Sequence, residues 1–399
     1  MKRVLMVSDV YFPRVNGVST SIATFRHALR QNGIEVSLVA PRYGDETDEA
    51  ADGITRVPGR PVPRDPEDRL SSWRQMHQIA LREAANCDLV HVQTPFVAHY
   101  AGVNAARKRG LPLLLTYHTF FEEYLHHYAP FLPATLLKAT ARRVSRSQCN
   151  AVDGVVVPST AMRDRLADYG VSAPLHVLPT GIPTAAFGAG NRQRFRRKHG
   201  IDENAPLALF IGRVAHEKNI GFLLDVAARA ANTLPGFILL IAGEGPAMAD
   251  LQRDAARRGL QQTVRFVGYL ERSVELHDCY AAADAFVFAS RTETQGLVLL
   301  EAMASGLPVV ALAAMGTIDI LAPRSGAIVA DDEPGAFTSA LIKLLSSPAL
   351  RRRLSTEALA ASRGWSDEAM ATRLADLYRS LAGHGARQAG QPFRRPTRA

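Results

Sequence analysis

Residues 285–311, AFVFASRTETQGLVLLEAMASGLPVVA, predict how the second half of the chain folds. The apolar run 285–288 is typical of a strand that is buried on both faces of a sheet. A polar loop follows, Gln295 or Gly296 opens a helix, and the apolar run 309–311 predicts the next strand. A strand joined to a second strand by a crossover helix is the unit from which parallel sheets are built.

The same alternation of short apolar runs and longer helical segments continues along almost the whole chain. In the first half we predict strands at 4–7, 35–39, 89–92, 113–116, 154–157 and 176–178. In the second half we predict strands at 207–211, 237–242, 264–266, 285–288, 309–311 and 326–329. The pattern predicts an α/β protein with two doubly wound, Rossmann-like parallel sheets. Such sheets bind ligands beyond the carboxyl ends of their strands, so we expect the chemistry in a cleft between the two domains.

A segment rich in proline, glycine and small residues, PTGIPTAAFGAGNRQRF at 179–195, separates the two series of strands. We therefore place a first domain at 1–183 and a second domain at 184–365, which agrees with the two domains that 399 residues predict. An amphipathic helix follows at 366–382. The tail 383–399 has four arginines and no apolar period, so we expect it to be disordered and basic.

The composition excludes several classes of protein. With 47% hydrophobic and 21% charged residues, the chain can form a large core. The net charge of +9 favours anionic partners, but basic and aromatic residues are not interleaved as in RNA-binding domains, so we expect no nucleic-acid partner. Three scattered cysteines, Cys87, Cys149 and Cys279, indicate a reducing cytosol. No apolar run reaches the roughly 18 residues of a membrane span, and the N-terminal apolar run is better interpreted as a first strand than as a signal peptide.

Two acidic residues bracket the predicted helix start in the second half. Helices begin with unpaired N–H groups and a positive dipole end, so the start at Gly296 can hold a phosphate group. Glu301 lies between one and two turns further along, where a ribose diol could bond its carboxylate. Glu293 lies in the loop just before the helix. The alternative is an ordinary helix with an acidic residue near its N-terminus and a surface glutamate.

Two cations follow the predicted strand 207–211, in the segment GRVAHEKN. Arg213 and Lys218 can neutralise a diphosphate and stabilise it as a leaving group. The alternative is that Glu217 pairs with Arg213 and that Lys218 is a solvated surface residue.

Five separated motifs resemble the retaining glycosyltransferases of family four, which have the GT-B fold. These motifs are VSDVYFPRVNGVSTS, GRVAHEKN, IAGEGP, VRFVGYL and the Glu293/Glu301 pair, and the resemblance covers roughly residues 1–382. It implies transfer of a hexose from a nucleoside diphosphate sugar with the anomeric configuration kept and without an obligatory metal or other cofactor. It also implies that the helix 366–382 returns to the first domain.

The resemblance assigns roles to residues of both halves. Arg213 and Lys218 hold the diphosphate, Glu301 holds the ribose, and Glu293 contacts the donor sugar. The helix start at Gly296 and Leu297 belongs to the same donor site. In the first half, Gly17 in PRVNGVSTS gives a backbone surface near the donor, and we expect Ser19 to cap the helix that follows. His118, after the strand 113–116, matches the active-site histidine that contacts the transferred sugar.

The reaction type follows from the residues around His118. His126 and His127 could suggest a metal, but their spacing to His118 is not that of a regular ligand set. No carboxylate stands out as a nucleophile for double displacement. We therefore expect transfer on one face of the sugar, in which the leaving diphosphate helps to take the proton of the acceptor.

The acceptor is predicted from a basic stripe in the first domain. Lys138, Arg142 and Arg146 recur at i, i+4 spacing in 133–150, and such a helix can lie on anionic lipid headgroups. The alternative is a solvated helix face, which is also how we interpret NRQRFRRKHG at 191–200. Within the family the motifs are most similar to diacylglycerol glycosyltransferases and related α-mannosyltransferases, and Gln295 stands where phenylalanine is common.

The prediction is therefore a hexosyltransferase that uses UDP-glucose, UDP-galactose or GDP-mannose to form a glycolipid on the inner face of the cell membrane. An enzyme with a polyprenyl-linked or soluble glycan acceptor is the alternative within the family. A different class, a glycosyltransferase-like scaffold without turnover, is disfavoured because the five charged and histidine positions are intact. A sugar-nucleotide epimerase shares the architecture but not the motifs.

Overall fold

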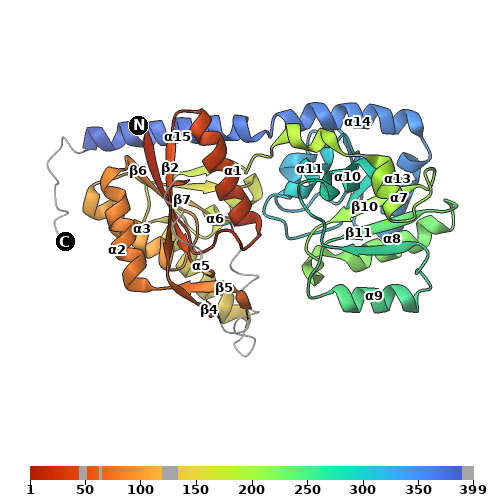
Figure 1. Ribbon diagram of the computed structural model, residues 1–399, viewed down its shortest axis with the longest axis horizontal. Helices are drawn as coiled ribbons and strands as arrows, with labels where there is room; N and C mark the ends of the chain where they lie inside the picture. The colour runs from red at the N-terminus through yellow and green to blue at the C-terminus, as the bar shows by residue number, and fades with distance from the viewer. Residues whose placement is uncertain (45–51, 63–64, 119–133, 389–399) are drawn as a thin grey trace. The chain divides into compact units, whose positions relative to one another are not determined.

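The computed structural model describes residues 1–44, 52–62, 65–118 and 134–388. The chain divides into a first unit, Met1–Gly181 with Asp367–Ala399, and a second unit, Ile182–Ser366 (Figure 1). The cleft that we expect between them stays a prediction.

In the described part of the first unit, a seven-stranded sheet has the order β3-β2-β1-β6-β7-β8-β9, and every pairing in it is parallel. Its strands are β1 (Arg3–Val7), β2 (Glu35–Pro41), β3 (Ile54–Val57), β6 (Leu89–Val92), β7 (Leu113–Thr116), β8 (Gly154–Val157) and β9 (Leu175–Val177). A separate antiparallel pair is formed by β4 (Gly59–Val62) and β5 (Asp65–Ser71). The helices are α1 (Gly17–Gln31), α2 (Trp73–Glu83), η2 (Ala84–Asn86), α3 (Val97–Arg109), α5 (Ala134–Cys149), α6 (Thr160–Asp168) and α15 (Asp367–Gln388).

In the second unit a six-stranded parallel sheet has the order β12-β11-β10-β13-β14-β15. Its strands are β10 (Leu207–Ile211), β11 (Ile238–Ala242), β12 (Val264–Gly268), β13 (Ala285–Phe288), β14 (Val309–Ala311) and β15 (Ala327–Val329). The longer helices are α7 (Arg192–Lys198), α8 (Ile220–Ala231), α9 (Met248–Arg257), α10 (Glu275–Ala282), α11 (Leu297–Ala304), α13 (Pro334–Leu345) and α14 (Pro348–Arg363). Shorter turns are η3 (Thr184–Ala189), η4 (His216–Lys218) and α12 (Thr317–Leu321).

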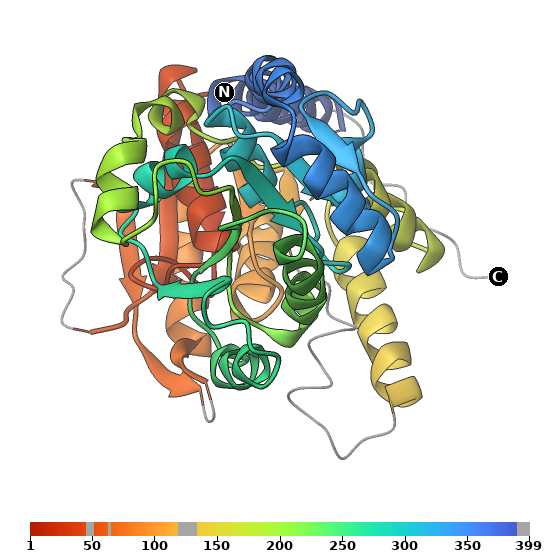
Figure 2. The same cartoon turned by 90° about the vertical axis from the view of Figure 1, so that its right-hand side faces the viewer.

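The prediction of two doubly wound parallel sheets is confirmed. Helices cover both faces of the sheet in each unit (Figures 1 and 2), and every residue of β10, β11 and β13 is buried. The twelve predicted strands are all present, with ends shifted by no more than two residues. Burial on both faces explains why continuous apolar runs identified these strands.

Three strands of the first unit were not predicted. β3 is a four-residue strand, ITRV, at the edge of the sheet. β4 and β5 have the sequences GRPV and DPEDRLS, in which prolines and charges replace the apolar residues of a buried strand. Their antiparallel pairing lies outside the main sheet, so neither strand needs to be buried on both faces.

The helix α15 belongs to the first unit although it ends the described chain. Its residues Leu374, Ala375 and Tyr378 are buried in one cluster with Ile22 and Leu29 of α1. The helix extends to Gln388, so the prediction that disorder begins at residue 383 is wrong for 383–388. Residues 389–399 lie outside the described part of the chain.

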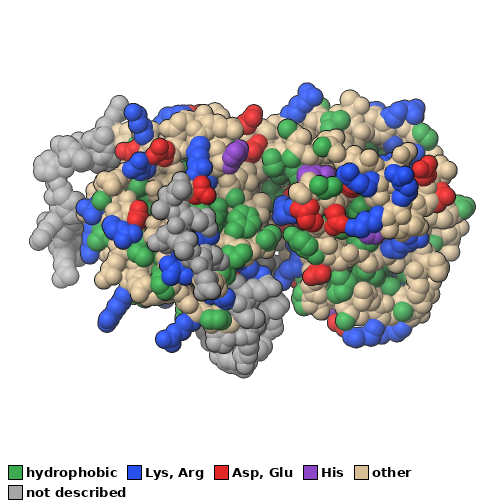
Figure 3. Space-filling model, viewed as in Figure 1, with side chains coloured by type: hydrophobic (Ala, Val, Ile, Leu, Met, Phe, Trp, Pro, Cys, Tyr) green, Lys and Arg blue, Asp and Glu red, His purple; other side chains and the backbone are tan. Residues whose placement is uncertain are grey.

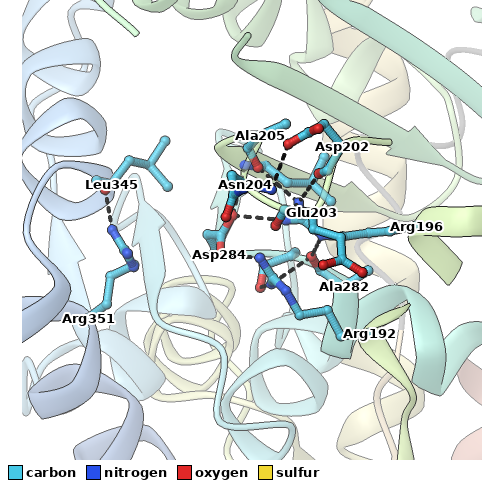
Figure 4. Close-up of polar contacts among 12 residues, drawn as sticks. Arg192, Arg196, Asp202, Glu203, Asn204, Ala205, Ala282, Asp284, Leu345 and Arg351 are labelled. Atoms are coloured by element: carbon cyan, nitrogen blue, oxygen red, sulfur yellow. Dashed lines mark hydrogen bonds and ion pairs between the residues drawn. The ribbon is translucent and has the colours of Figure 1, made fainter. Parts of the chain in front are cut away.

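The interpretation of 191–200 as a solvated helix is wrong for its central arginine. Arg196 of α7 is 1% exposed, and its guanidinium donates to the backbone oxygens of Ala282 and Ala205 at 2.9 and 3.0 Å (Figure 4). It also forms an ion pair of 3.0 Å with Asp284, which Arg192 contacts from the other side at 3.0 Å. Arg196 therefore fixes α7 to the residue that immediately precedes β13.

Both sheets have a switch point, where consecutive crossover connections run in opposite directions. It lies between β1 and β6 in the first unit and between β10 and β13 in the second. Ligands of doubly wound sheets bind at this place, beyond the carboxyl ends of the strands. The segments that follow β1, β6, β10 and β13 are therefore the candidates for the site.

Candidate active site

The segment after β10 is held in place by the segment after β11. Gly212 donates its N–H to the oxygen of Ala242 at 3.1 Å, and Val214 donates to the oxygen of Glu244 at 2.8 Å. Ala247 donates back to the oxygen of Val214 at 3.0 Å. The motif IAGEGP thus supports the backbone that carries Arg213 and Lys218.

The two predicted phosphate-binding cations have different environments. Arg213 is half-exposed and forms an ion pair with Glu217, as the alternative interpretation predicted. Lys218 is only 21% exposed and forms an ion pair with Glu293, which is 16% exposed, so it is not a solvated surface residue. The structure therefore brings Lys218 and Glu293 together from the two sides of the switch point.

The predicted phosphate site lies at the start of α11. The helix begins at Leu297, one residue later than the latest start that we predicted, and Gly296 is its N-cap residue. Gly296 has φ 95°, a conformation that glycine adopts without the steric cost of a side chain. Gly296 has no side chain to cap the helix. The Leu299 N–H donates to the Gly296 oxygen at 3.0 Å, so the N–H groups at the start of the first turn, those of Leu297 and Val298, are the ones that can face an anion.

Glu301 lies in the second turn of α11 and is buried. Its Oε2 accepts a hydrogen bond of 2.8 Å from the Tyr280 hydroxyl, and Arg272 lies 3.6 Å from its Oε1. Burial raises the pKa of this carboxyl above its usual range. Sequence reasoning missed Tyr280 and Arg272, because nothing in their spacing relates them to α11.

At the switch point of the first unit, Gly17 is the first residue of α1. Asn16 is the N-cap, and its side-chain oxygen accepts from the Ser19 N–H at 2.9 Å. The prediction that Ser19 caps this helix is therefore wrong, since Ser19 supplies the donor and Asn16 the acceptor. A Cβ atom at Gly17 would meet no atom within 4 Å, so the helix start is open to a ligand.

His118 lies two residues after the end of β7, and its side chain contacts the residue that follows β6. Its Nε2 lies 3.1 Å from Oε1 of Gln93, a residue that sequence reasoning missed. Burial lowers the pKa of His118 to about 4, so the ring is neutral near pH 7. The two residues line a cavity of about 20 Å³ together with Val18, Thr94, Pro95, Leu115, Thr116, Tyr117 and Gln148.

Asp9 is a further buried residue at this switch point, two residues beyond β1. It accepts hydrogen bonds from the Thr94 hydroxyl at 2.8 Å and from the N–H of Ala98 at 3.0 Å, so it caps α3. Burial raises its pKa to about 6. Its position after the first strand was a signal in the sequence, since the acidic residue lies two positions after a buried apolar run.

The basic residues of α5 are on its exposed side. Lys138, Arg142 and Arg146 are all exposed, whereas Leu137 and Ala141 of the same helix are buried. The guanidinium of Arg142 lies 5.4 Å from the centre of the Tyr169 ring. Elsewhere, Lys and Arg side chains are spread over the visible surface of both units with acidic side chains among them (Figure 3).

The described ranges contain neither a metal site nor a membrane-spanning helix. No three His, Cys, Asp or Glu side chains there are grouped as a metal site. No helix there combines the length and apolar character that crossing a bilayer requires. His126 and His127, the alternative metal ligands, lie outside the described residues.

The chain has two Rossmann-like sheets. At the switch point of the second sheet lie the two cations Arg213 and Lys218 and a helix start without a side-chain cap. These features define a GT-B glycosyltransferase. The chain belongs to glycosyltransferase family 4: the family model "Glycosyltransferase Family 4" matches residues 15–186, and the model "Glycosyl transferases group 1" matches residues 191–360. The first match covers most of the unit that contains Gly17 and His118. The second match covers most of the unit that contains Arg213 and Lys218.

Relatives at about one-third identity include two kinds of hexosyltransferase. The chain is 33% identical over 314 residues to an alpha-monoglucosyldiacylglycerol synthase of Streptococcus pneumoniae, covering 77% of this chain and 70% of the relative. It is 32% identical over 335 residues to a GDP-mannose-dependent alpha-mannosyltransferase of Mycobacterium tuberculosis, covering 82% and 83%.

Solved structures with the same fold cover nearly the whole chain. A sucrose-phosphate synthase from Thermosynechococcus elongatus matches 96% of this chain and 100% of its own, with a TM-score of 0.76 and 21% identity. Anabaena HepE in complex with UDP matches 95% of this chain and 100% of its own, with a TM-score of 0.75 and 17% identity. At these identities the likeness concerns the fold alone.

Proposed function

We propose that this glycosyltransferase moves a hexose from a UDP- or GDP-sugar to a membrane lipid such as diacylglycerol, with retention of the anomeric configuration. The observation that carries the donor site is the position of Lys218 and Glu293 beside the uncapped start of α11. The lipid acceptor is supported by the relatives named for diacylglycerol glucosylation. The proposal includes GDP-sugars because the named mannosyltransferases depend on GDP-mannose.

In this proposal the donor diphosphate binds at the switch point of the second unit. Arg213 and Lys218 neutralise its charge, the N–H groups at Gly296 and Leu297 contact a phosphate, and Glu301 receives the ribose hydroxyls. Glu293, already paired with Lys218, contacts the hexose. The proposal assigns charge neutralisation to protein groups, so we expect transfer to continue in a chelator such as EDTA.

The chemical step that we propose takes place on one face of the sugar. The bond between the anomeric carbon and the diphosphate oxygen breaks, and the acceptor oxygen bonds to the same carbon. The acceptor proton passes to the departing phosphate oxygen. His118 is neutral at physiological pH and hydrogen-bonds a hydroxyl of the hexose rather than acting as a base.

The acceptor lies in the membrane surface, and α5 is the element that we propose to contact it at the inner face. Its exposed cations can each contribute about 1 kcal/mol of attraction near anionic lipids. Liposomes with 30 mol% anionic lipid should sediment the protein, and changing Lys138, Arg142 and Arg146 to Glu should abolish sedimentation. Retained sedimentation would remove α5 from the proposal.

Product analysis tests the activity. Wild-type protein is incubated with UDP-glucose, UDP-galactose or GDP-mannose and dioleoylglycerol, and the anomeric configuration of the product is read by NMR. Lys218→Ala serves as the matched variant and should lower kcat by 100-fold or more, a typical effect for loss of a charge-stabilising donor. If the hexose is transferred to a polyprenyl-linked or soluble glycan and not to dioleoylglycerol, that glycan replaces the lipid as the proposed acceptor. The absence of both transfer and donor hydrolysis would indicate a scaffold.

A further inference from the structure

Gln93 has a side chain that is only half satisfied by the protein. It is 4% exposed and directly follows β6, and its backbone N–H donates to the oxygen of Val7 at 2.9 Å. Its Oε1 faces Nε2 of His118 at 3.1 Å. Its Nε2 is buried and has no hydrogen-bond partner among the described residues.

An unpartnered amide nitrogen in this position is costly. A buried donor without an acceptor loses its hydration without compensation, and native proteins rarely leave such groups unless a ligand or water completes them. Gln148, which lines the same cavity, donates its own Nε2 to the oxygen of Pro95 at 2.7 Å. Of these two glutamines, only Gln93 therefore has an amide nitrogen without an acceptor among the described residues.

The cavity beside Gln93 is large enough for one hydroxyl group. Its volume is about 20 Å³, and a water-sized group needs roughly 10–15 Å³ of such space. The walls include the apolar side chains of Val18 and Leu115, and Gln93 and His118 are among the residues that supply polar groups.

The contact between Gln93 and His118 also fixes the hydrogen on the imidazole ring. An amide oxygen only accepts hydrogen bonds, so Nε2 of the neutral ring carries the hydrogen and Nδ1 carries the lone pair. The two side chains together offer a donor, Gln93 Nε2, and an acceptor, His118 Nδ1. The two ring nitrogens of an imidazole point to different sides, so Nδ1 faces away from Gln93 and each of these groups bonds a separate hydroxyl.

We propose that Gln93 is a substrate-binding residue whose Nε2 donates to one substrate hydroxyl while its Oε1 holds His118 in the tautomer that accepts from a hydroxyl. The hydroxyl that Gln93 bonds belongs either to the transferred hexose or to the acceptor, whereas His118 accepts from a hydroxyl of the hexose, as proposed above. The binding role rests on the transfer reaction proposed above. The tautomer of His118 does not depend on that reaction.

Three variants separate the two halves of the Gln93 side chain. Gln93→Met removes donor and acceptor, whereas Gln93→Glu keeps an acceptor for His118 and removes the donor. Gln148→Met is the matched control, because it removes a buried amide whose nitrogen is already paired within the protein. Its thermal unfolding midpoint is expected to fall as much as that of Gln93→Met, while the tautomer of His118 stays that of wild type.

The tautomer is read by nitrogen-15 NMR of histidine-labelled protein without substrate. Wild type and Gln93→Glu should show His118 protonated at Nε2 with an unprotonated Nδ1, and Gln93→Met should show a mixture of tautomers. Protonation at Nδ1 in wild type would overturn the proposal, since it would place the amide nitrogen of Gln93 against His118.

The hydroxyl is identified with substrates that lack one hydroxyl at a time. Single-position deoxy analogues of UDP-glucose and GDP-mannose test the hexose, and an acceptor lacking one hydroxyl tests the lipid. For the recognised hydroxyl, wild type should lose about 10-fold in kcat/KM, whereas Gln93→Met and Gln93→Glu should lose nothing further. Equal losses in wild type and both variants would refute the binding role. If wild type transfers no hexose at all, the proposed function fails, and the His118 tautomer still decides the other half of the inference.

Discussion

Lys218 and Glu293 form an ion pair that joins the turn after β10 to the loop before α11. The two side chains are 21% and 16% exposed, so solvent screens their attraction less than that of a surface pair. In this state the cation that we assign to the diphosphate is already neutralised by a carboxylate. A diphosphate that binds here must share Lys218 with Glu293.

This competition predicts opposite effects of Glu293→Gln on binding and on turnover. Without the carboxylate, Lys218 is free and the diphosphate meets no negative neighbour, so the Kd for UDP or GDP should fall about threefold to tenfold. Transfer should fall at least 10-fold because the hexose loses a contact. Calorimetry and initial rates measure the two quantities. Glu217→Gln, which removes the ion-pair partner of the half-exposed Arg213, is the control and should change both quantities less. Unchanged affinity and rate in Glu293→Gln would contradict the shared-cation arrangement.

Tyr280→Phe should make nucleotide binding more sensitive to acid. The Tyr280 hydroxyl donates to Glu301 and lowers the pKa of a carboxyl that burial has raised. Removing the hydroxyl raises that pKa further, so Glu301 takes up a proton at a higher pH and loses its ability to accept two ribose hydroxyls. The Kd for UDP or GDP, measured by calorimetry from pH 5 to pH 8, should rise at a higher pH in Tyr280→Phe than in wild type. Superimposable pH profiles would show that the Tyr280 hydroxyl does not affect nucleotide binding and only stabilises the core.

Gly316→Ala should weaken the binding of UDP or GDP, although Gly316 is not one of the residues assigned to the donor site. A Cβ atom at Gly316 would lie 2.0 Å from the backbone oxygen of Thr294, and the Gly316 N–H donates to the oxygen of Glu293 at 2.8 Å. The loop before α11 must therefore move, and we expect at least a 10-fold loss of UDP or GDP affinity in calorimetry. Gly221→Ala is the control, because a Cβ there meets no atom within 4 Å. Alanine at this position within α8 should be neutral or stabilise by up to about 1 kcal/mol. Normal affinity in Gly316→Ala would mean that the loop adapts without effect on the site.

The parallel sheets were predictable because each buried strand is a continuous apolar run. The edge strand β3 and the pair β4 and β5 were not, since they lack that run. The charged residues at the second switch point were found from their places after β10 and β13. Their partners were not, because pairs such as Tyr280 with Glu301 and His118 with Gln93 join segments that only the tertiary fold brings together.

Arg196 is another residue whose role could not be predicted from the sequence, and its role is to stabilise the second unit. In sequence it is one of several arginines in a basic segment, yet it alone among Arg194, Arg196 and Arg197 is buried. Arg196→Met should lower the free energy of unfolding of the second unit by about 3 kcal/mol or more, because carbonyls and Asp284 lose a buried donor. Arg197→Met, an exposed neighbour, should change it by less than about 0.5 kcal/mol. Urea unfolding measures both, and equal effects would show that the Arg196 contacts contribute nothing net.

His91 predicts how stability depends on pH. Its Nδ1 lies 2.7 Å from the Tyr378 hydroxyl of α15 and its Nε2 lies 2.7 Å from the Thr116 hydroxyl, and burial lowers its pKa to about 3. Below about pH 6.5 the unfolded chain binds a proton at this residue that the folded protein does not, so unfolding becomes easier as the pH falls. Asp9 opposes this between about pH 6 and its unfolded value near 4, because its raised pKa makes the folded protein bind the extra proton there.

The contribution of His91 is isolated by His91→Gln, which keeps hydrogen-bonding groups but cannot be protonated in this range. Between pH 6.5 and pH 4.5 the wild type should lose up to roughly 1.4 kcal/mol of unfolding free energy per pH unit from this residue. The variant should lack that loss, although it is less stable at pH 7. Urea unfolding at a series of pH values measures the slope, and exposed His27→Gln is the control, for which we expect the wild-type slope. If His91→Gln also keeps the wild-type slope, His91 takes up its proton in the folded protein, and the contact between α15 and the sheet must open to admit it.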